Sequence, residues 1–488
     1  MLTRLFVDGF KNLVDTEVFF GPFSCIAGSN GVGKSNVFDA IYFLSRLADQ
    51  PFVEAARATR GGADIVELFT AGGDSRMRFE LDMLIPPEGK DDFHQPAKAS
   101  QTFLTYKLTL QLQDDLDGLP RVRLLHESLE HIPRSSAKER LGFEHSKTWR
   151  ESAVRTSQRR AAFIVSADVG DDKFVRLNSD KMRDESKLKR GGGRPTDFLA
   201  RTLPRTVLSA AQYADEARTA VLARAEMRSW RILQLEPSAL RRPDELQAPS
   251  VLGAEGEHLP ATLYRLASTS EPERVYAEVS NRLAELVNDV RFIRVDRDNA
   301  RRVLRLIMTD QNGVELPGSS LSDGTLRFIA LSVIEQDPRA TGLICLEEPE
   351  NGIHPERMDA MVGLLSDMAV DTTEPVGEDN PLRQIIVSTH SPVVAARVSP
   401  EDLLFADHRD PPNRKPGCFR ALVIRPVTKT RKNLSGTSPV SPVAKGDAIR
   451  YLGAIRPSVN QEAPDPKLPR TMFAYVTEQL DLPFGGSE

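Results

Sequence analysis

The sequence predicts an α/β fold in which a phosphate-binding loop joins a buried strand to a helix. A short apolar run, Phe23–Ala27, precedes residues 28–35, which read Gly-Ser-Asn-Gly-Val-Gly-Lys-Ser. Apolar side chains then recur at helical spacing over residues 36–47. A second apolar run, residues 343–346, ends in carboxylates, and a third ends at His390. Polar groups at the ends of these buried strands are candidates for a functional site.

Residues 28–35 match every fixed position of a P-loop. Its glycines let the backbone aim N–H groups at phosphate oxygens, and the following helix adds its positive N-terminal end. Lys34 is expected to reach the β- and γ-phosphates, and Ser35 to hold Mg²⁺. The residues expected to contact a nucleoside triphosphate are Gly28, Ser29, Asn30, Gly31, Val32, Gly33, Lys34, Ser35 and Asn36.

Two acids, Glu347 and Glu348, follow the apolar run at 343–346. Phosphoryl transfer needs one acid for the metal and one for the attacking water, so we assign Glu347 to Mg²⁺ and Glu348 to the water. The loop that follows contains His354, which either contacts nucleotide across an interface or caps the turn. Both interpretations stay open at this point.

Two further polar sites stand beside predicted core elements. Ser322 and Gly324 lie at the start of an apolar helix, where their hydroxyl and N–H groups are free to hold an anion. Such a pair is by itself an ordinary helix cap. His390 ends a core strand and is placed to reach a γ-phosphate. A lone histidine is more often structural, but its position at the strand end favours a functional role.

Taken in order, these motifs resemble the ABC-type ATPase heads of the RecF/SMC/OLD group, and most closely the bacterial AAA ATPases of that group. The matching segments are residues 28–35, residues 321–325 (Leu-Ser-Asp-Gly-Thr), residues 343–355 (through Glu-Pro-Glu-Asn-Gly-Ile-His-Pro) and residues 388–392 (Ser-Thr-His-Ser-Pro). The opening residues 2–12, which include Gly-Phe-Lys-Asn at 9–12, also look like the first strand of such heads. The middle of the chain carries little of the resemblance.

The resemblance implies that two heads meet head-to-tail and bury two ATP molecules between them. In that arrangement Ser322 and Gly324 contact the ATP of the other subunit, Glu348 is the base and His390 senses the γ-phosphate. The loop at 351–354 would couple the two sites. The chain departs from the pattern in having Glu347 where the family usually has Asp, and Asp323 ahead of Gly324 in place of a glycine pair. No glutamine loop follows the first helix.

Composition is typical of a soluble globular protein, with 488 residues, 40% hydrophobic and 27% charged. No apolar stretch has the length of a membrane span and no signal peptide is visible, so we expect a cytoplasmic protein without a membrane partner. The three cysteines form no metal-binding or disulfide pattern. A net charge of −5 argues against nucleic-acid binding through bulk charge, but not against a local basic patch.

Two basic stretches are candidates for such a patch. Residues 134–160 hold eight Lys or Arg against three Asp or Glu, with Trp149 in the middle, and residues 181–194 form the second stretch. One interpretation is a surface that follows a phosphate backbone. The other, which we favour from sequence, is that these are ordinary solvated loops.

We predict four regions along the chain. Alternating apolar and polar residues near 75–84, 102–113 and 122–132 predict an antiparallel β-subdomain, and helical spacing is found over 207–235 and 261–290. The predicted regions are an N-terminal ATPase lobe with the β-subdomain (1–178), a mostly helical insert (179–291), a C-terminal ATPase lobe (292–410) and a C-terminal extension (411–488).

These observations lead us to expect a Mg²⁺-dependent ATPase that forms a homodimer or higher oligomer on ATP. It would act as motor or sensor on DNA or on an effector, as in DNA repair or anti-phage defence. The acidic set of a Toprim nuclease is not visible, which predicts a separate effector protein such as a nuclease. The alternatives are the ATP subunit of a transporter and a nucleotide-gated scaffold that turns ATP over slowly.

Overall fold

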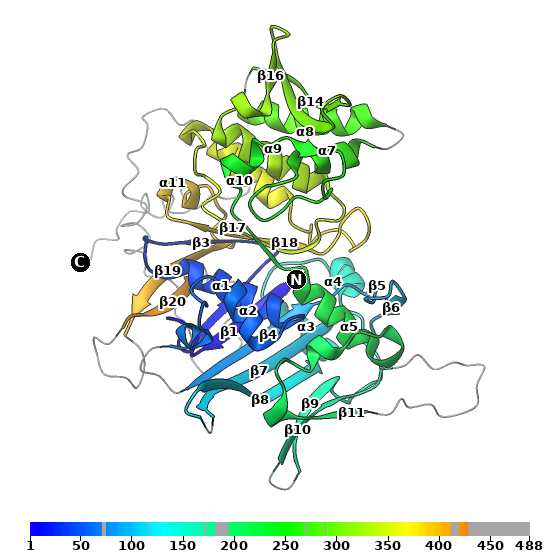
Figure 1. Ribbon diagram of the computed structural model, residues 1–488, viewed down its shortest axis with the longest axis vertical. Coiled ribbons are helices and arrows are strands. Elements are labelled where there is room, and N and C mark those ends of the chain that lie inside the picture. The colour runs from blue at the N-terminus through cyan, green and yellow to red at the C-terminus, as the bar shows by residue number, and fades with distance from the viewer. Residues whose placement is uncertain are drawn as a thin grey trace, which may run out of the picture.

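The computed structural model describes residues 1–70, 75–115, 117–169, 172–180, 195–268, 271–287, 289–410 and 419–427. The basic stretch at 181–194 and most of the predicted extension 411–488 lie outside these ranges. A six-stranded sheet crosses the middle of the molecule, with an eight-stranded sheet below it and a group of helices above it in the view of Figure 1. No helix in the described ranges combines the length and the apolar character needed to cross a membrane.

The helices are α1 (Lys34–Leu47), α2 (Phe52–Ala58), α3 (Arg134–Leu141), α4 (Lys147–Ala153), α5 (Ala214–Arg228), α6 (Pro237–Leu240), α7 (Leu259–Ala267), α8 (Pro272–Leu286), α9 (Asp323–Gln336), α10 (Met358–Asp367) and α11 (Pro392–Ala395). The strands are β1 (Leu2–Asp8), β2 (Thr16–Phe19), β3 (Phe23–Ala27), β4 (Arg76–Leu84), β5 (Glu88–Lys90), β6 (Pro96–Lys98), β7 (Phe103–Asp114), β8 (Pro120–His131), β9 (Ile164–Val169), β10 (Asp172–Leu177), β11 (Thr196–Leu199), β12 (Arg231–Leu233), β13 (Asp244–Glu245), β14 (Val290–Asp298), β15 (Val303–Asp310), β16 (Glu315–Pro317), β17 (Gly342–Glu347), β18 (Arg383–Thr389), β19 (Leu403–Arg409) and β20 (Ala421–Pro426).

The middle sheet has the strand order β12-β17-β18-β3-β19-β20. All neighbouring pairs from β12 to β19 are parallel, and only β20 is antiparallel. The register pairs Thr389 with Ala27 and Glu347 with Ser388, so β3, β17 and β18 end at the same edge. This edge is where an open α/β sheet binds its ligand. The predicted fold class is therefore confirmed in its central feature.

Side chains of the middle sheet alternate between two hydrophobic cores. Cys345 and Ile386 pack into the core that also holds α1 and the antiparallel sheet, whereas Ile344 and Leu346 pack into the core of α9 and α10. Strands buried on both faces explain why these runs are almost continuously apolar in the sequence. As a result α1, which carries the end of the P-loop, lies between two sheets (Figure 1).

The antiparallel β-subdomain predicted from alternating residues is present. Its strand order is β11-β10-β9-β8-β7-β4-β1-β2, and the three predicted segments correspond to β4, β7 and β8. One face of this sheet buries apolar side chains against α1, including Phe79 and Leu108. The opposite face carries charged side chains such as Arg4 and Lys107.

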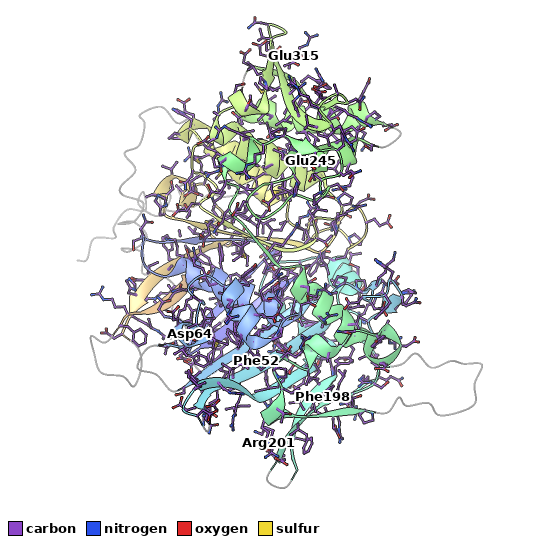
Figure 2. The ribbon with its side chains drawn as sticks, in the orientation of Figure 1. Phe52, Asp64, Phe198, Arg201, Glu245 and Glu315 are labelled. Carbon is purple, nitrogen blue, oxygen red and sulfur yellow. The ribbon has the colours of Figure 1, made fainter. Side chains whose placement is uncertain are left out.

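The predicted insert does not form one separate helical body. Helix α5 packs on β6 and on α1, β12 is the edge strand of the middle sheet, and α7 and α8 pack on α9. In Figure 2, Phe198 and Arg201 lie near the lower end of the molecule, whereas Glu245 lies in the upper part. The chain between 195 and 291 thus contributes to both lobes, while the other domain boundaries stay predictions.

The basic segment at 134–160 is partly helical and not simply a run of solvated loops. It forms α3, α4 and the loop at 154–163 that leads to β9. Trp149 is fully buried with Ile132, Leu141 and Val154, and its indole therefore cannot stack on a base.

Gln384 joins the two sheets. Its buried side chain accepts a hydrogen bond from Leu2 N at 2.7 Å and donates to Leu2 O at 2.7 Å and Gly21 O at 2.8 Å.

We expect Gln384→Ala to lower the free energy of unfolding by about 3 kcal/mol, because these buried backbone groups lose their partner. Urea denaturation followed by circular dichroism measures the change. Gln247→Ala, at an exposed position, is the control, and equal midpoints for both variants would contradict this role.

Candidate active site

The P-loop connects β3 to α1 and depends on a backbone conformation that favours glycine. Gly33 caps α1 with φ of 103°. A Cβ at Gly33 would lie 2.3 Å from the side-chain nitrogen of Asn12. Asn12 itself donates to Val32 O at 3.2 Å and accepts from Asn36 Nδ2 at 2.7 Å. Asn12 therefore braces the P-loop from the turn between β1 and β2, a role that the sequence alone did not reveal; β1 ends at Asp8, earlier than the strand expected over residues 2–12.

The ammonium group of Lys34 lies folded onto its own loop. Lys34 Nζ donates to Gly28 O at 2.8 Å and to Ser29 O at 2.9 Å. Burial lowers the pKa of Lys34, and the negative charges of Glu348, Glu350 and Glu347 oppose that shift. Lys34 is thus a buried cation whose present partners are carbonyl oxygens. Phosphate oxygens are stronger partners and are suited to replace these carbonyl oxygens.

Glu348 and His390 meet at the edge of the middle sheet. Glu348 Oε1 lies 2.9 Å from His390 Nδ1, and Glu348 Oε2 accepts from Asn351 Nδ2 at 3.0 Å. The Glu348 backbone has φ of 47° and its N–H donates to Ser388 O at 2.9 Å. Partial burial raises the pKa of Glu348, but the hydrogen bond from Asn351 and the neighbouring His390 and Lys34 outweigh burial, so the net shift is downward. The carboxylate therefore stays ionised as a base must.

A third acid, Glu350, lies behind this pair. It is 6% exposed, and its Oε1 accepts a hydrogen bond from Thr389 Oγ1, while Oε2 has no hydrogen-bond partner within the described ranges. Thr389 Oγ1 in turn accepts from Ser391 N at 2.9 Å. Burial raises the pKa of Glu350, with partial opposition from the Thr389 hydrogen bond. Glu350 thus links the loop after β17 to the loop that carries His390. The Glu-Pro-Glu run is the sequence signal that points to it.

Arg60 lies between the two residues predicted to hold Mg²⁺. Its guanidinium contacts the Glu347 carboxylate at 3.0 and 3.2 Å, Asp39 at 3.1 Å and Ser35 O at 3.3 Å. Lys11 Nζ also contacts Asp39 at 2.6 Å. Burial lowers the pKa of Arg60, but the hydrogen bond to Glu347 and the charge of Asp39 outweigh it and raise the pKa. No motif marks Arg60, since an arginine beyond the first helix fits many surface roles.

Arg60 shows that the Glu347 carboxylate and the Ser35 carbonyl oxygen face a cation here, and a serine hydroxyl with a carboxylate fits Mg²⁺ in donor chemistry. Within the described ranges, no cluster of three His, Cys, Asp or Glu could hold a metal by itself. Mg²⁺ at nucleotide sites is usually held by one or two protein groups together with substrate phosphates. Ser35 and Glu347 would hold it here, and the bound ion would neutralise charge on the phosphates.

The signature-like residues do not join this cluster within the chain. Ser322 caps α9 by accepting from Thr325 N at 3.2 Å. A Cβ at Gly324 would lie 2.3 Å from Gly352 O, so the loop after β17 packs directly on the start of α9. Figure 1 shows α9 on the opposite side of the middle sheet from α1. His354 accepts a hydrogen bond from Glu356 N at 3.4 Å, and its side chain is 70% exposed. His354 therefore caps the turn, as one of the two interpretations predicted, and its contact to nucleotide stays a prediction.

We expect Gly33→Ala to reduce ATP affinity at least tenfold, because alanine is strained at this positive φ and its Cβ would strike Asn12. Isothermal titration with ATP measures the effect. Gly363→Ala is the matched control, since its Cβ would meet nothing within 4 Å in α10. That substitution should leave ATP binding unchanged and add about 0.5–1 kcal/mol of stability. Wild-type affinity in Gly33→Ala would contradict the assignment of the loop.

We expect Arg60→Ala to lower the Mg²⁺ concentration needed for nucleotide binding by several-fold, because the guanidinium no longer competes for Glu347. Titration of Mg²⁺ at fixed ATP, followed by fluorescence of a labelled nucleotide, measures this change. Arg57→Ala removes an exposed arginine one turn earlier on α2 and serves as the control. A Mg²⁺ dependence identical in all three proteins would show that Arg60 and Mg²⁺ do not share this corner.

Comparison with known proteins agrees with this geometry. Residues 23–183 and 196–396 match the family model described as "AAA domain, putative AbiEii toxin, Type IV TA system". A DNA replication and repair protein RecF of Parabacteroides distasonis is 46% identical over 46 residues, which are 9% of this chain and 13% of that protein. The chromosome partition protein Smc of Bacillus subtilis is 27% identical over 202 residues, which are 38% of this chain and 15% of that protein.

Solved structures with a distant likeness are also SMC heads. One is an SMC head bound to the C-terminal winged-helix domain of ScpA, with 13% identity, 87% and 98% of the two chains covered and a TM-score of 0.46. Another is the SMC head domain of Thermotoga maritima, with 12% identity, 88% and 99% covered and a TM-score of 0.36.

The family model matches most of this chain. By contrast, this chain matches only 13% and 15% of the lengths of the RecF and Smc relatives. The family match includes the strand before the P-loop, the acidic pair Glu347–Glu348 and His390. The chain is similar in part to RecF and Smc proteins, and it belongs to this AAA-domain family.

Proposed function

We propose that this protein binds and hydrolyses ATP with Mg²⁺, and that it dimerises head-to-tail on ATP to act as a motor or sensor. The observation that carries the proposal is the cluster of Lys34, Glu348 and His390 at one edge of the middle sheet. A phosphate-holding lysine beside an ionised carboxylate that is oriented by two side chains is the arrangement needed for attack of water on a γ-phosphate.

The proposed roles follow from the contacts. Backbone N–H groups of the P-loop and Lys34 hold the phosphates, and Lys34 exchanges its carbonyl partners for phosphate oxygens. Glu348 accepts the proton of the attacking water. His390 and Asn351 hold its two carboxylate oxygens, so a γ-phosphate that draws His390 away would also release the base.

A chain of hydrogen bonds supports the dimeric mechanism. Arg327 on α9 donates to Asn351 O at 2.5 Å, and the Asn351 side chain donates to Glu348. The helix that begins with Ser322 and Gly324 is therefore connected to the base of the same subunit. Binding of a second subunit's ATP at the start of α9 would shift this helix and, through Asn351, the position of Glu348.

The process that ATP hydrolysis would serve is proposed from the names of the relatives. RecF is named for DNA replication and repair and Smc for chromosome partition. We propose that the dimer acts on DNA or on a separate effector protein, in repair or anti-phage defence. The family description also names a putative AbiEii toxin of a Type IV TA system.

We expect Glu348→Gln to lower the rate of ATP hydrolysis by at least about 100-fold, because the amide cannot accept the proton. ATP binding should persist, and an ATP-trapped dimer should accumulate. Phosphate release and light scattering after size-exclusion chromatography measure the two effects. Glu356→Gln is the control, since Glu356 is an exposed acid of the same loop.

Unchanged hydrolysis in Glu348→Gln would remove Glu348 as the base. Tight ATP binding by a wild-type protein that hydrolyses almost nothing would favour the slow nucleotide-gated scaffold instead. A monomer in Glu348→Gln with bound ATP would contradict the head-to-tail dimer.

A further inference from the structure

A cavity of about 530 Å³ opens where β8 ends and the loop at 154–163 passes it. It lies in the basic segment that sequence alone suggested to be solvated loop. The lining contains three arginines, one histidine and no carboxylate, which is unusual in a chain with more acids than bases. The residues that line it are Gln101, His131, Pro133, Arg134, Thr156, Ser157, Gln158, Arg159 and Arg160.

The wall of this cavity is held by buried contacts. Gln101 is 3% exposed, and its Nε2 donates to Arg159 O at 3.0 Å and to Ser157 O at 3.4 Å. The Arg159 guanidinium donates to Ser179 O at 2.8 Å and to Ala161 O at 3.1 Å. It also lies 4.9 Å from the Phe163 ring centre. The loop is therefore shaped before any ligand arrives.

The charge that a ligand of this cavity would meet comes mainly from Arg160 and Arg134. Arg160 is exposed and forms no ion pair or hydrogen bond with any residue that the structure describes. Arg134 contacts Glu151 at 3.2 Å, but both side chains are about half exposed or more, so the pair is weak and easily exchanged. Arg159 has carbonyl partners and also lies 3.8 Å from the buried carboxylate of Asp180, so part of its charge is already compensated and its main role is to shape the cavity wall.

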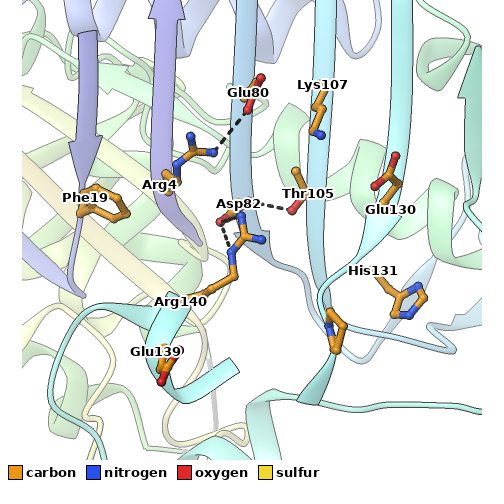
Figure 3. Close-up of a pocket in the computed structure, with 11 residues that line it drawn as sticks. Arg4, Phe19, Glu80, Asp82, Thr105, Lys107, Glu130, His131, Glu139 and Arg140 are labelled. Carbon is orange, nitrogen blue, oxygen red and sulfur yellow. Dashed lines mark hydrogen bonds and ion pairs between the residues drawn. The ribbon is translucent and has the colours of Figure 1, made fainter. Parts of the chain in front are cut away.

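The neighbouring cavity differs in charge. It has a volume of about 460 Å³ and shares His131 and Pro133 with the first. Figure 3 shows Asp82 held by Arg140 and Thr105, and Arg4 directed at Glu80. Its lining contains four carboxylates (Glu80, Asp82, Glu130, Glu139) against three Lys or Arg (Arg4, Lys107, Arg140). An anion is therefore favoured on only one side of the His131–Pro133 corner.

We propose that the arginine-lined cavity, defined by Arg134, Arg159 and Arg160, binds backbone phosphates of a nucleic-acid strand. Guanidinium groups pair with phosphate oxygens in a fork, and Thr156 and Ser157 add hydroxyl donors. Exposed Arg155 lies beyond the cavity and pairs with Glu88 at 3.4 Å, a solvent-exposed contact that a phosphate of a longer strand can replace. No aromatic side chain lines the cavity apart from the His131 ring, so binding is through the backbone and independent of base sequence.

Strand binding at this cavity does not depend on the proposed function. Only its expected effect, a rate of ATP hydrolysis that changes with nucleic acid, rests on that function. The binding itself is tested without nucleotide. Fluorescence anisotropy with labelled single-stranded DNA of about 20 nucleotides, at two salt concentrations, gives the affinity and its salt dependence. Parallel arms use duplex DNA of the same sequence and inorganic pyrophosphate as competitor.

We expect the double variant Arg134→Glu and Arg160→Glu to weaken strand binding at least about tenfold and to reduce the salt slope by about two. The matched control is Arg291→Glu with Arg339→Glu, which has the same net charge and alters exposed arginines on β14 and after α9. Circular dichroism and ATP binding show that both variants are folded.

Equal loss of binding in both double variants, or none in either, would overturn the proposal. Binding of pyrophosphate in the cavity without binding of any strand would also overturn it, because the site would then serve a free anion. Strand binding that depends on Arg134 and Arg160 in a protein that hydrolyses no ATP would support this inference while the proposed function fails.

Discussion

The parallel pairing of β18 between β3 and β17 is the constraint on which the candidate site depends. Its register brings the ends of three strands, separated by hundreds of residues in the chain, to one edge. Gln384, on the same strand, joins the middle sheet to the backbone of β1. Loss of this pairing would separate the strand that ends at the P-loop from the strand that carries Glu348, because β18 lies between them in the sheet.

The reactive charges at this edge all have protein partners. Lys34 is held by carbonyl oxygens, Glu347 by Arg60, and Glu348 by His390 and Asn351. Such compensation lowers the cost of gathering three carboxylates in a partly buried corner. It also means that binding of a nucleotide is an exchange of partners. New contacts to a nucleotide would have to be more favourable than the internal contacts that they replace. Affinity for phosphate would therefore depend on how easily Arg60 and His390 leave their present partners.

Two sets of packing contacts join the candidate site to its surroundings. The close approach of Gly324 to Gly352, together with the bond from Arg327 to Asn351, connects α9 to the loop after β17. On the other side of the middle sheet, α1 packs against the antiparallel sheet, whose strand β8 leads to the arginine-lined cavity. A ligand on either lobe therefore has a packed route to the P-loop or to Glu348.

The sequence by itself determined the P-loop, the acidic strand end, the three strands β4, β7 and β8, and the helix cap at Ser322, because each depends on residues close together in the chain. Only the tertiary structure decided that His390 contacts Glu348, that Arg60 lies at Glu347 and that Asn12 braces the loop. It also placed Trp149 in a hydrophobic core, although charged residues flank it in the chain. Local patterns report backbone conformation and burial, whereas contacts between distant residues follow from the order of strands in a sheet, which no local pattern encodes.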